Sequence, residues 1–93
     1  MTPQEVLAAV KEALERGNGA YALSPHCRKQ MKARGFLAGD ITRALTGATN
    51  ATVDDEIPGR WRISGGTDTE EEPLTVVIEI HSNGHIEIIT PLK

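Results

Sequence analysis

The sequence predicts an α+β fold in which N-terminal helices pack on one face of a four-stranded, mainly antiparallel sheet. Up to residue 47, apolar residues recur at helical spacing between capping signals. From residue 50 onward the pattern changes to short alternating or β-branched runs, which are typical of strands. A chain of 93 residues has room for one core, so residues 1–93 are expected to form a single domain.

The first helix is expected to begin after Thr2 and to stop at Gly17-Asn18-Gly19. Thr2 can cap it, Pro3 suits the first helical position and Glu5 completes a capping box. The apolar residues that then recur at helical spacing are Val6, Ala9, Val10, Ala13 and Leu14.

A short apolar segment, Tyr21-Ala22-Leu23, leads into a second helix, which Ser24-Pro25 starts and Gly35 ends after about three turns. Cys27 and Met31 fall on its buried side. Cys27 is therefore predicted to be a small core residue rather than a nucleophile, although the first turn of a helix can lower the pKa of a thiol. The residues predicted to point outward are Arg28, Lys29 and Lys32.

A third, short helix is predicted from Asp40 in its first turn and from Ile41, Ala44 and Leu45 on its inner side. Gly47 ends it. The residue before it, Leu37 or Ala38, offers no side-chain oxygen as a cap, so the start of this helix is expected to fray.

Four strands follow. The first opens at Thr52 and Val53 and ends before Pro58-Gly59, a turn signal. The second, 60–64, alternates so that Trp61 and Ile63 share one face while Arg60 and Arg62 share the other. An acidic loop from residue 65 to 73, expected to be mobile, leads to two Val- and Ile-rich strands, 74–81 and 85–90.

The last two strands are predicted to form a hairpin closed by Ser82-Asn83-Gly84, with Gly84 in the left-handed conformation. This register pairs Ile80 with Ile86 and Ile78 with Ile88 on one apolar face. It also places His81 opposite His85, and Glu79 opposite Glu87, on the other face.

The net charge of −3 argues against a generic nucleic-acid binder, but the charge is uneven. Four cations and no acid lie between Ser24 and Gly35, whereas acids collect at 54–56 and 68–72. The single cysteine fits a reducing compartment, and no segment reads as a signal peptide or a membrane span. A cytoplasmic location without a membrane is expected.

Three motifs resemble the family known as domain of unknown function 4258 (DUF4258). They are Tyr21-x-x-Ser24-x-His26, Met31-x-x-Arg34-Gly35-Phe36 and Asp40-Ile41-x-x-Ala44-Leu45. The resemblance covers about three quarters of the chain and leaves out the first helix. Two positions depart from the pattern, because Gln30 stands where many members have an arginine and Leu37 replaces the usual Thr or Ser.

The DUF4258 family is similar in topology to the RelE, BrnT and MqsR toxins, which are ribonucleases paired with an antitoxin. The resemblance therefore implies a RelE-like fold and metal-independent mRNA cleavage by the toxin of a type II toxin–antitoxin pair. The catalytic candidates are His26 as base or acid, with Arg34, Arg60 and Arg62 on the scissile phosphate. The candidates for binding RNA or a partner are Arg28, Lys29 and Lys32.

Each candidate also has a structural reading. His26 can pack near Tyr21 and hydrogen-bond the helix start or a strand carbonyl. Arg60 and Arg62 can form ion pairs with Glu79 or Glu87, which would neutralise a phosphate site. The alternative function is therefore a non-catalytic interaction module of the same fold that binds a partner through its basic helix.

The paired histidines His81 and His85 can chelate a divalent metal with help from Glu79 or Glu87. Two imidazoles are too few for a structural zinc site, so the sequence favours solvated histidines. No metal and no cofactor are expected. The partners expected are a cognate antitoxin or other protein and, for the ribonuclease, mRNA.

Overall fold

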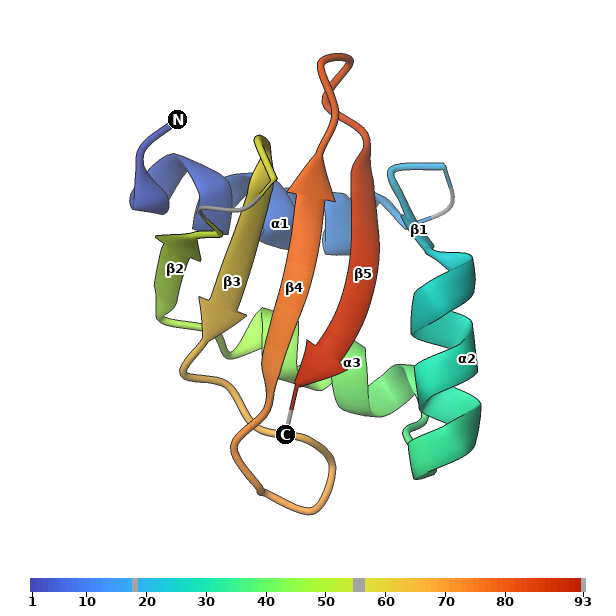
Figure 1. Ribbon diagram of the computed structural model, residues 1–93. Coiled ribbons are helices and arrows are strands. Elements are labelled where there is room, and N and C mark those ends of the chain that lie inside the picture. The colour runs from blue at the N-terminus through green and yellow to red at the C-terminus, as the bar shows by residue number, and fades with distance from the viewer. Residues whose placement is uncertain (18, 55–56, 93) are drawn as a thin grey trace.

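The computed structural model describes residues 1–17, 19–54 and 57–92, so Asn18 of the first stop signal and Asp55 and Glu56 of an acidic run lie outside the described residues. Figure 1 shows its three helices and its sheet. The helices are α1 (Pro3–Arg16), α2 (Pro25–Arg34) and α3 (Ala38–Thr46). The strands are β1 (Tyr21–Leu23), β2 (Asn50–Val53), β3 (Arg60–Ser64), β4 (Thr75–Ile80) and β5 (Ile86–Leu92).

The α+β class is confirmed, but the sheet has five strands rather than four, in the order β1-β5-β4-β3-β2. The additional strand is the apolar segment Tyr21–Leu23, which pairs in parallel with β5. All other pairs are antiparallel. Three residues are too few to show an alternating pattern, and their partner strand lies far along the chain, so β1 could not be seen in the sequence.

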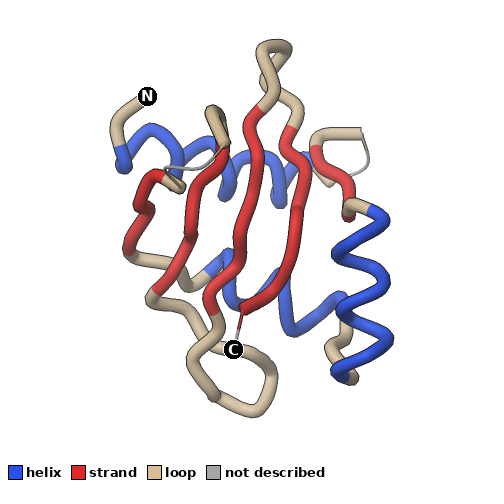
Figure 2. The backbone as a smooth tube through the Cα atoms, in the orientation of Figure 1, coloured by secondary structure: helices blue, strands red, loops and turns tan. Residues whose placement is uncertain are grey.

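Two of the three helices lie on one face of the sheet, whereas α2 lies along its flank beside β1 and β5 (Figure 2). The core forms between that face and the helices α1 and α3. Its fully buried members include Val6, Val10, Ile41, Leu45, Ile63, Ile78 and Ile88. None of the described helices covers the opposite face of the sheet, and we call it the open face (Figure 1).

The predicted hairpin register is confirmed. Ile80 pairs with Ile86, Ile78 with Ile88, and Glu79 with Glu87. The His81 N–H donates to the His85 carbonyl at 2.9 Å, and Gly84 has a φ of +86°, the left-handed conformation that its loop requires.

The predicted caps of α1 and α2 are also confirmed, but the start of α3 is anchored rather than frayed. The buried carboxylate of Asp40 accepts a hydrogen bond from the Leu37 N–H at 2.8 Å. Its other oxygen accepts from the Thr69 N–H at 3.0 Å and from the Thr69 hydroxyl. Asp40 therefore ties the N-cap residue to the first turn, as the third helical residue of a capping box does, although Leu37 has no side-chain oxygen for the N–H groups of that turn.

The same contacts fasten the acidic loop, which was expected to be mobile. Asp68 is buried and accepts from the N–H groups of Glu70 and Glu72 at 2.8 and 3.0 Å. At the beginning of the loop, Gly66 is buried against the backbone of Ala44 in α3. The loop is thus built onto α3, at the end of the sheet where the C-terminus lies (Figure 1).

Candidate functional site

A β-bulge in β5 shapes the open face. Val77 pairs with Thr90 but Ile78 pairs with Ile88, so Ile89 is an extra residue in the ladder. A bulge re-aims the side chains that follow it. Here it brings both Ile89 and Thr90 to the open face, where they line a cavity of about 370 Å³ together with His26 and Arg62.

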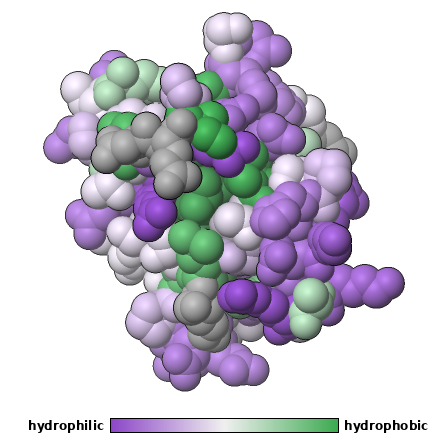
Figure 3. All heavy atoms as spheres, viewed as in Figure 1, coloured by the Kyte–Doolittle hydropathy of each residue, from purple (hydrophilic) through white to green (hydrophobic). Residues whose placement is uncertain are grey.

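This cavity, which we call the open-face cavity, has cationic and apolar walls and one carboxylate, that of Asp54. Its lining residues are His26, Asp54, Arg60, Arg62, Val77, Ile89, Thr90 and Leu92. Figure 3 shows an apolar band along the middle of this face with hydrophilic side chains on both sides of it. The structure therefore brings three of the four predicted catalytic residues to one cavity.

Ser24 fixes the position of His26. Its N–H donates to the Ile88 carbonyl at 2.9 Å, and its hydroxyl donates to the carbonyl of the bulged Ile89 at 3.0 Å. The same hydroxyl oxygen accepts from the Cys27 N–H at 2.9 Å and so caps α2. Two residues after this buried anchor, His26 is exposed.

His26 has no hydrogen-bond partner among the described residues. The capping role that would have explained it structurally belongs to Ser24, and the helix start is satisfied without the imidazole. The exposed imidazole is therefore available to a ligand of the open-face cavity.

The two arginines of β3 differ in their surroundings. The Arg60 Nε donates to Glu79 Oε1 at 3.0 Å, an ion pair that is mostly shielded from solvent. Within the described part of the chain, the side chain of Arg62 has neither a hydrogen bond nor an ion pair. A glutamate thus pairs with the charge of Arg60, as predicted, but not with that of Arg62.

Arg34, the fourth catalytic candidate, lies elsewhere. It lines a different cavity with Asp40, Asp68 and Glu70, at the C-terminal end of α2. Eight residues separate it from His26, which in a helix is about 12 Å. The structure does not bring Arg34 together with His26, Arg60 and Arg62.

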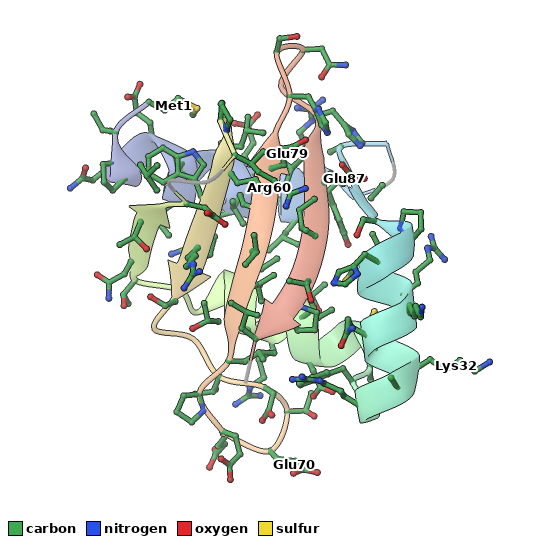
Figure 4. All side chains as sticks on the ribbon, viewed as in Figure 1. Met1, Lys32, Arg60, Glu70, Glu79 and Glu87 are labelled. Atoms are coloured by element: carbon green, nitrogen blue, oxygen red, sulfur yellow. The ribbon has the colours of Figure 1, made fainter. Side chains whose placement is uncertain are left out.

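The three cations predicted to point outward, Arg28, Lys29 and Lys32, are all exposed. The side chains of these three residues have no hydrogen-bond or ion-pair partner in the described residues. Figure 4 shows Lys32 projecting away from the sheet. This basic surface of α2 is therefore separate from the open-face cavity and faces solvent.

Cys27 is fully buried in the core, as predicted. Burial raises the pKa of its thiol. The positive charge of Arg28 acts in the opposite direction, but its effect is smaller than that of burial. The suggestion that the helix start lowers this pKa is therefore wrong, and the thiol stays protonated and enclosed.

A further group of polar side chains lies at the hairpin end of the open face. The group consists of Glu79, His81 and Glu87. Their potential ligand atoms lie within 4.8 Å of one another, which is close enough to hold a metal ion. Sequence reasoning did not predict the other cavity residues, which are Asp54, Val77, Ile89, Thr90 and Leu92. The bulge brings Ile89 and Thr90 there, and neither it nor the cavity has a local sequence signal.

Comparison with protein families gives one match, the domain of unknown function DUF4258, over residues 23–90. The chain belongs to the DUF4258 family. The matched range holds the last residue of β1, then α2, α3, β2, β3, β4 and β5 as far as Thr90, and it leaves out α1. Comparison with curated proteins and with solved structures gives no match.

The DUF4258 motifs now have structural explanations. The serine of the entry motif is the anchor between α2 and β5, and the aspartate before the Ala-Leu pair is Asp40, the fastener of the acidic loop. Among the described residues, the side chains of His26 and of the exposed cations on α2 have no such structural role. None of the described helices has the length and apolar character needed to cross a membrane.

Proposed function

We propose that this DUF4258 protein is the toxin of a type II toxin–antitoxin pair, a RelE-like endoribonuclease that cleaves mRNA in the open-face cavity without a metal. The observation that supports this best is that His26, Arg60 and Arg62, from elements far apart in the sequence, line one cavity. An imidazole facing guanidinium groups is the arrangement needed to move a proton near a phosphate.

In the proposed reaction, the neutral His26 imidazole accepts the proton of a ribose 2′-OH, and the 2′ oxygen attacks the adjacent phosphorus. The bond from phosphorus to the 5′ oxygen breaks, and the leaving oxygen takes a proton from water, whose hydroxide then recovers the proton held by His26. The products are a 2′,3′-cyclic phosphate and a 5′-hydroxyl end. No co-reactant is required.

Arg62 is the proposed stabiliser of the negative charge that develops on the phosphoryl oxygens. Arg60 can assist, because its ion pair with Glu79 uses Nε and leaves the outer N–H donors of the guanidinium. Glu79 also holds Arg60 in place, so the arginine is oriented before RNA binds. The apolar residues Val77, Ile89 and Leu92 would keep water from the phosphate and contact the base or sugar.

The cleavage prediction is that the purified protein cuts single-stranded RNA in the presence of EDTA and leaves cyclic phosphate ends. His26→Ala is expected to slow cleavage by about 10²–10⁴-fold. Arg62→Ala is expected to slow it by about 10²–10³-fold, the typical cost of losing one charge-stabilising donor. Both residues are exposed, so the circular dichroism spectrum and the melting temperature should not change.

Arg43→Ala is the matched control, because Arg43 is an exposed arginine of α3 outside the open-face cavity. It should cleave at the wild-type rate. Intact RNA with the wild type, or full activity of His26→Ala, would exclude this mechanism.

The second candidate is a non-catalytic module that binds an acidic protein through α2. It is favoured by the exposed, unpaired cations of that helix, since charge without an internal partner is free to meet a partner's acids. The same surface would serve a toxin in binding its antitoxin.

The binding prediction uses co-expression with the product of the adjacent gene. Lys29→Glu with Lys32→Glu should weaken the complex about tenfold or more, because like charges then face each other. Lys11→Glu, at an exposed lysine of α1, should leave it intact. A complex that survives the double reversal would show that α2 is not the contact. A complex without any RNA cleavage would favour the module.

A further inference from the structure

Two glutamates with the same charge lie directly opposite each other on the open face. Glu79 of β4 pairs with Glu87 of β5, and both are partly buried. Like charges facing each other across an antiparallel pair are destabilising. Figure 4 shows the side chains of Arg60, Glu79 and Glu87 close together near the hairpin end of the sheet.

The single guanidinium of Arg60 offsets only one of the two carboxylates. It bonds Oε1 of Glu79, which leaves Oε2 of that residue directed elsewhere. The imidazole of His81 lies close to oxygens of both glutamates and is within hydrogen-bonding distance of Glu87. Its Nε2 lies 3.6 Å from Glu79 Oε2 and 3.3 Å from Glu87 Oε1.

These separations match a coordination shell. Ligand atoms bound to zinc at about 2.0–2.1 Å in a tetrahedron are about 3.4 Å apart. The distances from His81 Nε2 to both carboxylates fall at that value. The ring is also oriented, because His85 stacks on it with the ring centroids 6.1 Å apart and 27° between the planes.

We propose that Glu79 Oε2, His81 Nε2 and Glu87 Oε1 bind one divalent transition-metal ion, Zn²⁺ in the first place. The imidazole favours such an ion over Mg²⁺ or Ca²⁺, which prefer oxygen ligands alone. Three protein ligands leave a fourth position open to water, which the partial exposure of all three side chains permits. Arg60 then acts from the outer shell by holding Glu79 through its second oxygen.

The ion changes the charge of this end of the open face. With a neutral His81, two carboxylates against one guanidinium leave one negative charge, and a divalent ion turns this into one positive charge. The sequence suggested His81 and His85 as metal ligands. In the structure, the proposed ligands are His81 and the two glutamates. The site touches the proposed ribonuclease only through the Arg60–Glu79 ion pair, because its three ligands do not include His26 or Arg62, the residues proposed to act on the RNA.

The experiment is a titration of the metal-free protein with ZnCl₂, followed by calorimetry and by the NMR signals of the three histidines. One ion per chain should bind, with the His81 signals shifting most. Glu87→Gln, which keeps the shape of the side chain, and His81→Ala should each weaken binding about tenfold or more. MgCl₂ should not compete.

Two matched controls are available. Glu70→Gln changes an exposed carboxylate of the acidic loop, and His26→Ala removes an exposed imidazole of another element. Both should bind zinc as the wild type does. Absence of saturable binding, unchanged affinity of Glu87→Gln, or loss of binding in His26→Ala would each overturn the site, whatever the RNA assay gives.

Discussion

Gly66→Ala is expected to destabilise the domain by about 3 kcal/mol or more, the upper range for overpacking. A Cβ on Gly66 would lie 2.7 Å from the carbonyl carbon of Ala44 and 3.0 Å from its Cα, and still closer to its oxygen. The neighbour is the backbone of α3, which cannot rotate away as a flexible side chain would. The melting temperature should fall by about 12 °C or more.

Gly39→Ala is the matched control, since its Cβ would meet only the Thr69 methyl group at an ordinary 3.9 Å. Gly39 lies in the first turn of α3, where alanine is the better helix former. This variant should be as stable as the wild type or slightly more so. A melting temperature of Gly66→Ala within a few degrees of wild type would mean that the loop does not pack against α3 in solution.

Ser24→Ala is the second substitution with a large expected effect, a loss of about 2–4 kcal/mol. The variant loses the cap of α2, which is typically worth about 1 kcal/mol, and leaves the buried Ile89 carbonyl without this donor. Chemical denaturation measures the global loss. Amide hydrogen exchange should show α2 opening more often than the rest of the protein.

Thr2→Ala is its control. Thr2 caps α1 through the same kind of bond, from Glu5 N–H at 3.2 Å, but it is exposed and makes no bond to the sheet. It should lose only about 1 kcal/mol or less. Equal losses for the two variants would contradict the role of Ser24 as an anchor between α2 and β5.

Local chemistry made much of the fold predictable. Caps and stops act within one turn, so Thr2, Ser24 and Gly35 marked helix ends correctly. The hairpin register followed from matching isoleucines across three loop residues, and both arginines of β3 fell on the expected face. These features depend on residues close in sequence.

Features that depend on distant residues were missed. β1 forms by pairing with the edge of β5, which lies far along the chain. The bulge at Ile89 has no signal in the neighbouring sequence. The spacing of residues in the sequence could not show that Arg34 lines another cavity. It also could not show which arginine of β3 would form an ion pair with Glu79. The start of the third helix was misjudged partly for the same reason, since Asp40 gains its second partner from a loop 29 residues later, but its bond from the Leu37 N–H is local and was overlooked.

The hydrogen bond from Ser24 to Ile89 spans 65 residues, and this separation has a consequence during synthesis. At about 5–20 residues per second, a ribosome needs roughly 3–13 seconds to add the strand on which α2 docks. Until then β1 has no partner and His26 has no fixed place relative to Arg62. A nascent chain therefore assembles the open-face cavity late, and a protein that binds the emerging α2 could act before any such cavity exists.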